Sequence, residues 1–343
     1  MSVALLDQIL AEIEDEDELD DFDPSQPSLE STAAAGHPFS VAWSHEVRAI
    51  LAGLESRRLR DASGPWMLET PFSLEHVKLC AVIPDALGDG GLSSVGNFHD
   101  GFSTTISSSH EHLSASLGVT VGYPFLNASV SAKYDKTVKE NKNGVKASRN
   151  ASCRVGRVVV DETPPLSRES MRILQSQDGQ AKFRKRYGDY YVCGFALGAD
   201  AGACMSASTE SMSSKETLEI TVKVKLLFFT ASATHTETWE SSSQSSSMSF
   251  SGYSTLDPNQ QPFALTLSSN QSVNPGRDEM ILRQHAMVYL DKVSSLTTEV
   301  WKKLQELGLT EDGAELKLAD CTRLCKSGLV VELLLAPYAR LNH

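Results

Sequence analysis

Residues 182–202 read KFRKRYGDYYVCGFALGADAG. The stretch begins as a basic, helix-compatible segment and continues into aromatic and β-forming residues with closely spaced glycines. Glycine has no Cβ and tolerates positive φ, so Gly194 and Gly198 near the start of a strand predict a sharp bend or a place where another backbone packs closely. The rings of Tyr187 and Tyr191 are expected to bury large areas where the helix joins the strand. The alternative is a helix stop followed by an ordinary bulged strand.

The segments around this stretch form separate runs of helix and of strand. Apolar periodicity predicts helices at 45–59, 167–179 and 281–305, and Ser167 is the expected cap of the second. Alternation of apolar and polar residues predicts strands at 113–123, 126–134, 151–158, 218–228, 263–267 and 328–341. Because these elements do not alternate as βαβ units, the predicted class is α+β with a largely antiparallel sheet.

The charge of the chain is concentrated at its start. The formal net charge is -13, and the first thirty residues contain eleven acidic residues and no Lys or Arg, so the remainder carries about -13 + 11 = -2. We expect residues 1–38 to form an acidic, disordered tail and linker, and residues 39–343 to form the folded domain, without a separate C-terminal targeting module. The remainder lacks a long basic stripe, which argues against nucleic-acid binding.

The composition is that of a protein made in the cytoplasm. The N-terminus lacks the basic and apolar regions of a signal peptide, and no run of about eighteen apolar residues suggests a membrane-spanning helix. Non-classical secretion is compatible with this pattern. The six cysteines are dispersed through the 343 residues, so free thiols are expected. Cys321 and Cys325 are spaced to share a helix face, which indicates packing.

The order of the predicted elements, with the stretch quoted above between helices and a long strand, resembles the membrane attack complex/perforin (MACPF) family of pore-forming proteins, and its fungal members in particular. The family signature is aromatic-Gly-Thr-His-aromatic followed by paired glycines. Here Tyr187, Gly188, Asp189, Tyr190 and Tyr191 occupy that place, and Gly194 and Gly198 follow. Asp189 and Tyr190 replace the Thr-His pair, and Ala199 stands where a second glycine is usual. The resemblance spans about residues 75–340.

The resemblance implies a bent, largely antiparallel central sheet flanked by helical clusters. It also implies that two Ser-rich β excursions are the segments that enter a membrane. A spanning strand needs roughly nine to eleven residues with one apolar face. The candidate membrane-facing residues are Leu117, Val119, Val121, Val130, Trp239, Met248 and Phe250. Serine on both faces is costly in lipid, so soluble surface hairpins are the alternative.

Enzymatic signatures are absent from the sequence. It contains no Gly-rich phosphate loop, HExxH or GxSxG motif, so no catalytic residue and no cofactor is assigned. His110 and His112 form an H-x-H pair without a third ligand nearby, and exposed polar residues on a β excursion are favoured over a metal site.

Three functions follow as hypotheses. The first is a MACPF-like pore former that oligomerises and inserts β-hairpins, and that needs a specific lipid or a membrane-binding partner protein. The second is a non-lytic binding or accessory protein with the same fold. The third is an enzyme that uses a cleft beside the bent sheet.

Overall fold

The computed structural model describes residues 33–43, 47, 49–59, 64–83, 96–103, 145–209, 246–257, 263–267 and 275–341. Within these ranges ten strands form one sheet, and all of the strand pairs are antiparallel. The strands are β1 (Phe39–Ala42), β2 (Gly53–Leu54), β3 (Lys78–Val82), β4 (Gly96–Ser103), β5 (Val145–Val160), β6 (Tyr190–Thr209), β7 (Ser246–Ser254), β8 (Phe263–Leu267), β9 (Glu315–Lys317) and β10 (Val330–Pro337).

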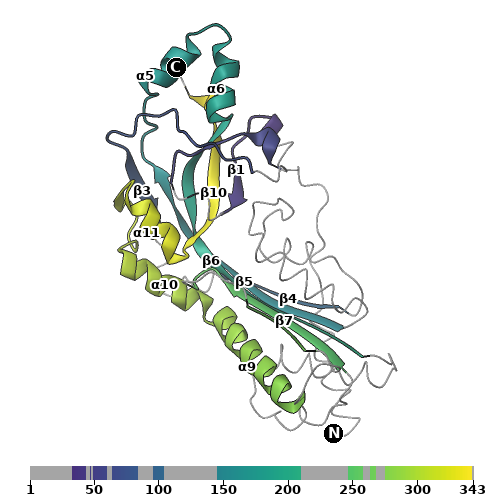
Figure 1. Cartoon of the computed structure of the whole chain (residues 1–343). Helices are drawn as coiled ribbons and strands as arrows, with labels where there is room; N and C mark the ends of the chain where they lie inside the picture. Colours follow the sequence, from purple (N-terminus) through teal and green to yellow (C-terminus); the bar gives the residue numbers. More distant parts are fainter. Residues whose placement is uncertain are drawn as a thin grey trace.

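The sheet is bent (Figure 1). Its upper part has the order β1-β10-β6-β5-β3-β9, and its lower part is built from β4, β5, β6, β7 and β8. The long strands β5 and β6 pass through both parts and pair from Val145↔Ala207 to Val159↔Gly194. The register between them shifts at Arg154/Gly156. The predicted α+β class with a bent, largely antiparallel sheet is therefore confirmed.

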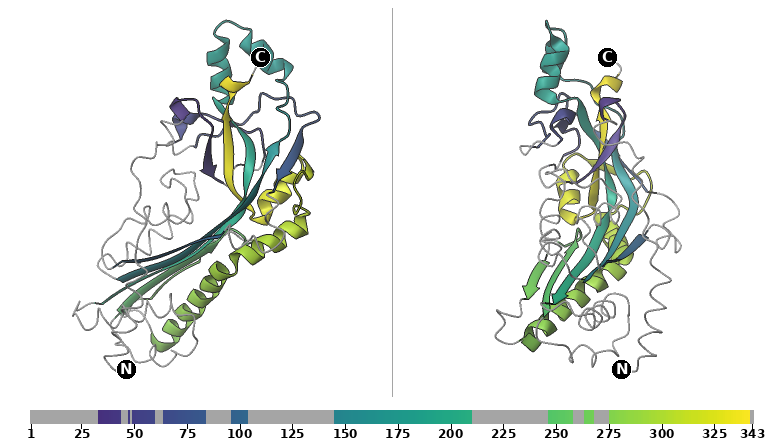
Figure 2. Two further views of the ribbon diagram at one scale, coloured as in Figure 1. Left: turned by 180° about the vertical axis from the view of Figure 1, so that it is seen from behind. Right: turned by 90° about the vertical axis from the view of Figure 1, so that its right-hand side faces the viewer.

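Helices flank the sheet in two places. The helices α9 (Pro275–Ser294), α10 (Leu296–Leu307) and α11 (Asp320–Ser327) follow one side of it, and α9 runs along the lower part (Figures 1 and 2). The helices α5 (Arg168–Leu174) and α6 (Gly179–Tyr187) lie at the opposite end of the molecule from α9. Two short 3-10 helices, η1 (Ser56–Arg58) and η5 (Tyr338–Arg340), complete the described elements.

Local sequence explains where these helices start and stop. The Oγ of Ser167 accepts a hydrogen bond from the backbone N–H of Ser170, so the predicted cap of α5 is present. The helices α10 and α11 each end at a glycine in the left-handed region, Gly308 at φ 70° and Gly328 at φ 85°. Glycine adopts this conformation without the steric cost that a Cβ imposes.

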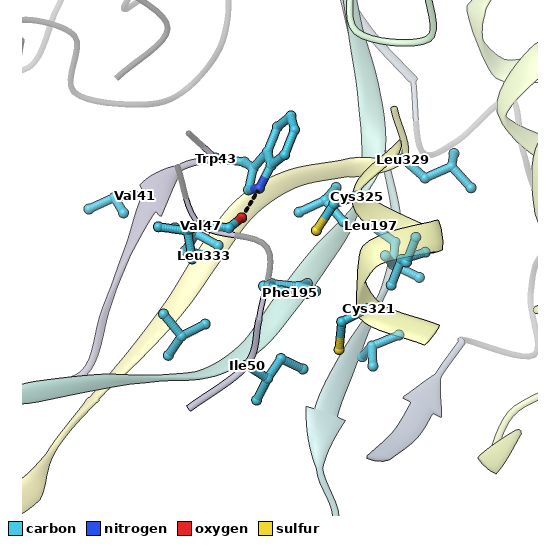
Figure 3. Close-up of a cluster of buried hydrophobic side chains, with 14 of the residues drawn as sticks. Val41, Trp43, Val47, Ile50, Phe195, Leu197, Cys321, Cys325, Leu329 and Leu333 are labelled. Carbon is cyan, nitrogen blue, oxygen red and sulfur yellow. Dashed lines mark hydrogen bonds between the residues drawn. The ribbon is translucent and has the colours of Figure 1, made fainter. Parts of the chain in front are cut away.

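The main hydrophobic core lies where β1, β6 and β10 face α11. Figure 3 shows Phe195 and Leu197 of β6 packed among Val41, Leu333 and the two cysteines of α11. Cys321 and Cys325 are buried on the same helix, as their spacing predicted. The indole Nε1–H of Trp43 donates a hydrogen bond of 2.7 Å to the carbonyl oxygen of Val47.

The helix predicted at 45–59 is wrong for the residues that the structure describes there. Residues 49–51 form a turn, β2 and η1 follow, and Leu51 has φ 72°, which is incompatible with a right-handed helix. Val47, Ile50, Leu51 and Leu54 are nevertheless all buried. The apolar pattern therefore identified core residues and misassigned their backbone, because a short irregular segment can bury the same side chains as a helix.

Several other predictions fall on residues that the structure does not describe. The expected strands at 113–123, 126–134 and 218–228 lie outside the described residues. So does most of the expected tail, although Ala33 is described and is buried in the core. Among the described residues, no helix is long and apolar enough to cross a membrane.

Candidate functional site at the sheet bend

The signature stretch forms the joint between α6 and β6. Gly188 ends α6 with φ 85°, and its N–H donates to the carbonyl oxygen of Arg184. A Cβ at Gly188 would collide with the backbone of Leu54, and a Cβ at Gly53 would collide with the carbonyl oxygen of Tyr187. Strand β2 therefore lies in backbone contact with the joint, and both glycines are required by that close approach.

The tyrosines of the joint are buried on both sides of the sheet. Tyr187 and Tyr191 belong to an aromatic cluster, defined here as Phe72, Phe183, Tyr187, Tyr191 and Tyr338, whose neighbouring ring centroids lie 4.9–5.8 Å apart. Burial raises the pKa of Tyr187, of Tyr191 and of Tyr338, so these phenols stay neutral. The joint is thus held by aromatic packing from α6, β6 and the segment after β10.

Tyr190 points to the other side. Its ring packs on Phe39 with centroids 4.9 Å apart, and its hydroxyl donates to the carbonyl oxygens of Ala33 at 2.9 Å and His37 at 3.1 Å. This residue ties the start of the described chain to the start of β6.

The carboxylate of Asp189 accepts three hydrogen bonds. Oδ1 accepts from the backbone N–H of Ser56 at 2.7 Å, and Oδ2 accepts from the Ser56 hydroxyl at 2.6 Å. The Nη2 of Arg184 donates to Oδ2 at 2.8 Å, and Arg184 also donates from Nε to Glu55 Oε2 at 3.0 Å. The hydrogen bond to Glu55, followed by the charges of Asp189 and Glu55, raises the pKa of Arg184 despite its partial burial. These groups fasten η1 to the joint.

Gly194 and Gly198 mark close backbone packing. Neither has positive φ, so the left-handed bend that was one expectation is not present at these two positions. A Cβ at Gly194 would lie 2.6 Å from the carbonyl oxygen of Val158, and a Cβ at Gly198 would collide with the carbonyl oxygen of Cys153. The second expectation, a close approach of another backbone, is the one that the structure shows.

An ion cluster lies next to Gly198, where the β5–β6 register shifts. Arg154 of β5 donates from Nη1 to Asp200 Oδ1 at 2.7 Å, from Nη2 to Asp200 Oδ2 at 3.2 Å and from Nε to Glu332 Oε1 at 2.9 Å. The three residues join β5, β6 and β10. Burial by itself lowers the pKa of Arg154, but Asp200 and Glu332 raise it overall, so the guanidinium stays charged. Burial raises the pKa of Asp200, and Arg154 opposes that shift.

Two of the residues predicted to face a membrane, Met248 and Phe250, are described by the structure, and both lie in the lower sheet beneath α9. Met248 and Phe250 of β7 are buried in a second cluster, defined here as Val145, Ala147, Ala203, Met205, Ala207, Met248, Phe250, Leu282, Ala286 and Tyr289. Leu117, Val119, Val121, Val130 and Trp239, together with His110 and His112, lie outside the described residues. Sequence analysis did not identify the role of α9 as the cover of Met248 and Phe250.

Sequence analysis also missed the polar partners at the bend. The contacts of Asp189 with Ser56 span 133 positions, and those of Arg154 with Asp200 and Glu332 span 46 and 178. No local spacing signal connects residues so far apart.

No family model matches this chain, and no curated protein matches it. Solved structures with which it can be superposed include wild-type pneumolysin, at 10% identity over 88% of this chain and 60% of that one, with a TM-score of 0.37. A non-hemolytic pneumolysin from Streptococcus pneumoniae matches at 12% identity, 87% and 59% coverage and a TM-score of 0.39. The cytotoxin suilysin from Streptococcus suis matches at 11%, 87% and 59%, with a TM-score of 0.33. This chain thus spans about 60% of the length of the pneumolysin chain, and similarities at this level establish no family for it.

Proposed function

We propose that this chain is a MACPF-like pore former that associates edge to edge, inserts β-hairpins into a membrane, and needs a particular lipid or a membrane-binding partner to do so. The observation that carries the proposal is the bent sheet whose signature stretch forms the start of its longest described strand. In the MACPF resemblance this is the region where a sheet bends and later straightens.

Close contacts between strands hold the bend. Backbone contact at Gly194 and Gly198 fixes the separation of β5 and β6, and the Arg154 cluster joins both strands to β10. A pore former must hold such a sheet closed in water and release it at a membrane. The Arg154 cluster is suited to that requirement, because loss of one guanidinium would release its side-chain links to β6 and β10 together.

The lower sheet has an apolar face that a helix covers. Leu282, Ala286 and Tyr289 of α9 pack on Met248 and Phe250 of β7. Displacement of α9 would uncover this face, which supports a role in lipid insertion or in contact with another subunit.

The lower sheet also has lateral edges for association. Among the described strands, β4 pairs with β5 alone and β8 pairs with β7 alone. Backbone N–H and C=O groups at such edges are templates for a further strand. When copies of the chain associate edge to edge, these backbone groups form hydrogen bonds between the copies. No complementary surface of side chains is required for that association.

The test is leakage of a trapped dye from lipid vesicles. Purified protein is expected to release little dye from vesicles of a single phosphatidylcholine, and to release it from vesicles made of a natural lipid extract or in the presence of a membrane-binding partner. Ring-shaped oligomers in electron micrographs should accompany release. If no mixture gives leakage or rings, the pore proposal fails and the non-lytic binding function replaces it.

A reversible disulfide between α9 and β7 tests whether leakage requires these two elements to separate. A Cβ at Gly252 would lie 2.6 and 2.7 Å from the Cδ2 and Cδ1 atoms of the Tyr289 ring. Cysteines at these two positions therefore approach the Cβ–Cβ separation of about 4 Å that a disulfide needs. The variant Gly252→Cys/Tyr289→Cys should lose leakage when oxidised and regain it on reduction. The single variant Tyr289→Cys is the matched control and should be indifferent to the redox state.

A further inference from the structure

The helical hairpin of α5 and α6, residues 168–187, carries a surplus of positive charge. It contains six basic residues (Arg168, Arg172, Lys182, Arg184, Lys185 and Arg186) and two acidic ones (Glu169 and Asp178). Arg184 is engaged by Glu55 and Asp189, and Arg186 by Glu69 and Glu169. The other four are exposed and have no carboxylate partner among the described residues. They are called the basic face below.

Both helices of the hairpin contribute to the basic face. On α5, positions 168, 171, 172 and 175 follow the i, i+3, i+4, i+7 spacing of one helix face, and all four side chains are exposed. Met171 therefore stands as an exposed apolar side chain between Arg168 and Arg172. Lys182 and Lys185 occupy one face of α6, which packs beside α5 at the same end of the molecule (Figure 1). Such a surface fits an acidic segment that also carries apolar side chains.

A segment of that chemistry belongs to this chain. Residues 1–30 hold eleven acidic residues without a Lys or Arg, interspersed with Leu and Ile. The chain between this segment and the fold enters the described structure at Ala33. The carbonyl oxygen of Ala33 accepts from the hydroxyl of Tyr190, and Tyr190 follows Lys185 by five residues. The acidic segment is thus tethered at the start of β6, the strand that follows α6.

The tether has sufficient length. Ala33 follows Asp23 by ten positions, and a flexible linker of that length would span roughly 15–20 Å on average. Lys185 lies on the last turn of α6 and precedes Tyr190 by five residues. Because consecutive Cα atoms are about 3.8 Å apart, the Cα atoms of these two residues lie at most about 19 Å apart. Tethering raises the local concentration of the acids to the millimolar range, at which weak exposed ion pairs become occupied.

We propose that the acidic segment of residues 7–30 docks on the basic face of the α5–α6 hairpin of the same molecule. The docked segment neutralises the four exposed cations and covers Met171. The contact is electrostatic and therefore sensitive to salt, because exposed charges are screened over about 10 Å at 0.1 M salt. This inference is independent of pore formation.

Zero-length cross-linking of the full chain tests the proposal. A carbodiimide joins a carboxylate to a lysine amine when the two are in contact, and mass spectrometry locates the joined residues. Cross-links between the acids of residues 7–30 and Lys182 or Lys185 are expected at least five-fold more often than to Lys302 of α10 and Lys326 of α11, which are exposed as well. Raising the salt from 0.05 to 0.5 M, a change of roughly three-fold in the screening length, should remove most of this excess.

A pair of charge reversals provides the control. Arg168→Glu/Arg172→Glu leaves both reporting lysines in place and should lower their cross-links to the acidic segment at least three-fold. Arg277→Glu/Arg323→Glu changes the same charge on α9 and α11 and should leave the yield unaltered. The proposal is overturned if the four lysines react equally, if the α5 reversals have no effect, or if all cross-links join two copies of the chain.

Discussion

At the scale of single residues, one carboxylate links η1 to the joint between α6 and β6. Asp189 accepts two hydrogen bonds from Ser56 and one from Arg184, and its side chain is 21% exposed. Its removal would leave the partly buried N–H of Ser56 without its acceptor and Arg184 with Glu55 alone. Ser56 would then lose its hydrogen bonds to Asp189, while the pairing of β2 with β6 remains.

Asp189→Ala should therefore destabilise the protein by about 2 kcal/mol, the usual cost of unpaired buried donors after allowance for partial exposure. The midpoint of urea denaturation measures the change. Asp189→Asn retains an acceptor and should recover about half of it. Glu311→Ala removes an exposed carboxylate that is not part of this network and serves as the control. Equal midpoints for Asp189→Ala and Glu311→Ala would contradict this role.

The backbone contact at Gly198 makes a second prediction at this scale. Gly198→Ala forces a methyl group into the carbonyl oxygen of Cys153, so the β5–β6 ladder must shift, at a cost of about 2–3 kcal/mol. Gly308→Ala meets no atom within 4 Å but has φ 70°, so it reports the conformational cost alone, about 1 kcal/mol. The midpoint temperature of thermal unfolding should be lower for Gly198→Ala than for Gly308→Ala. The reverse order would mean that β5 and β6 separate easily at the bend.

At the scale of elements, α9 is amphipathic and its two faces should respond differently. Leu282 is completely buried against the lower sheet, whereas Met287 is 49% exposed. Leu282→Ala should cost about 2–4 kcal/mol, because it removes buried methyl groups and leaves a cavity. Met287→Ala should change stability by less than about 0.5 kcal/mol. Chemical denaturation of both variants checks the orientation of α9, and a larger loss for Met287→Ala would contradict it.

The elements with a strong local signal were predictable. Ser167 and the apolar spacing after it identified α5, and continuous periodicity over 281–305 identified α9 and α10 as one helical region. The break between them at Ser295 was not predicted, since no proline or glycine marks it. The helix prediction for 45–59 was wrong because the leucines and the isoleucine of this segment have helical spacing. In the structure, tertiary contacts impose a positive φ at Leu51, which ends that pattern.

The geometry of the candidate site was largely beyond sequence analysis. The closeness of backbones at Gly194 and Gly198 was anticipated from the lack of a Cβ. The pairing of Arg154 with Asp200 and Glu332 depends on the register of three strands, and the pattern of a strand does not determine its register with distant partners.

At the scale of the whole molecule, buried neutral acids set the response to alkaline pH. Burial raises the pKa of Cys153 to about 11 from an ordinary 9.0, and it raises the pKa of Tyr191 and Tyr338 as well. A group whose pKa is higher in the folded state than in the unfolded state contributes stability at pH values below its unfolded-state pKa. This stability is lost as the pH rises through the folded-state pKa. The urea midpoint should thus be constant from pH 7 to 8.5 and fall between pH 9 and 11. Cys153→Ala should make that fall shallower, and a midpoint that rises with pH would contradict the assignment.

The pairing of β1 with β10 has a consequence for how the chain is made. Phe39 of β1 lies opposite Leu335 of β10, so the first described strand finds its partner almost three hundred positions later. A ribosome adds about 5–20 residues per second, so β1 waits roughly 15–60 seconds after it is synthesised. During that time the N-terminal strand is an unpaired segment available to chaperones. The upper sheet can therefore close only after β10 has left the ribosome, long after β1 has been synthesised.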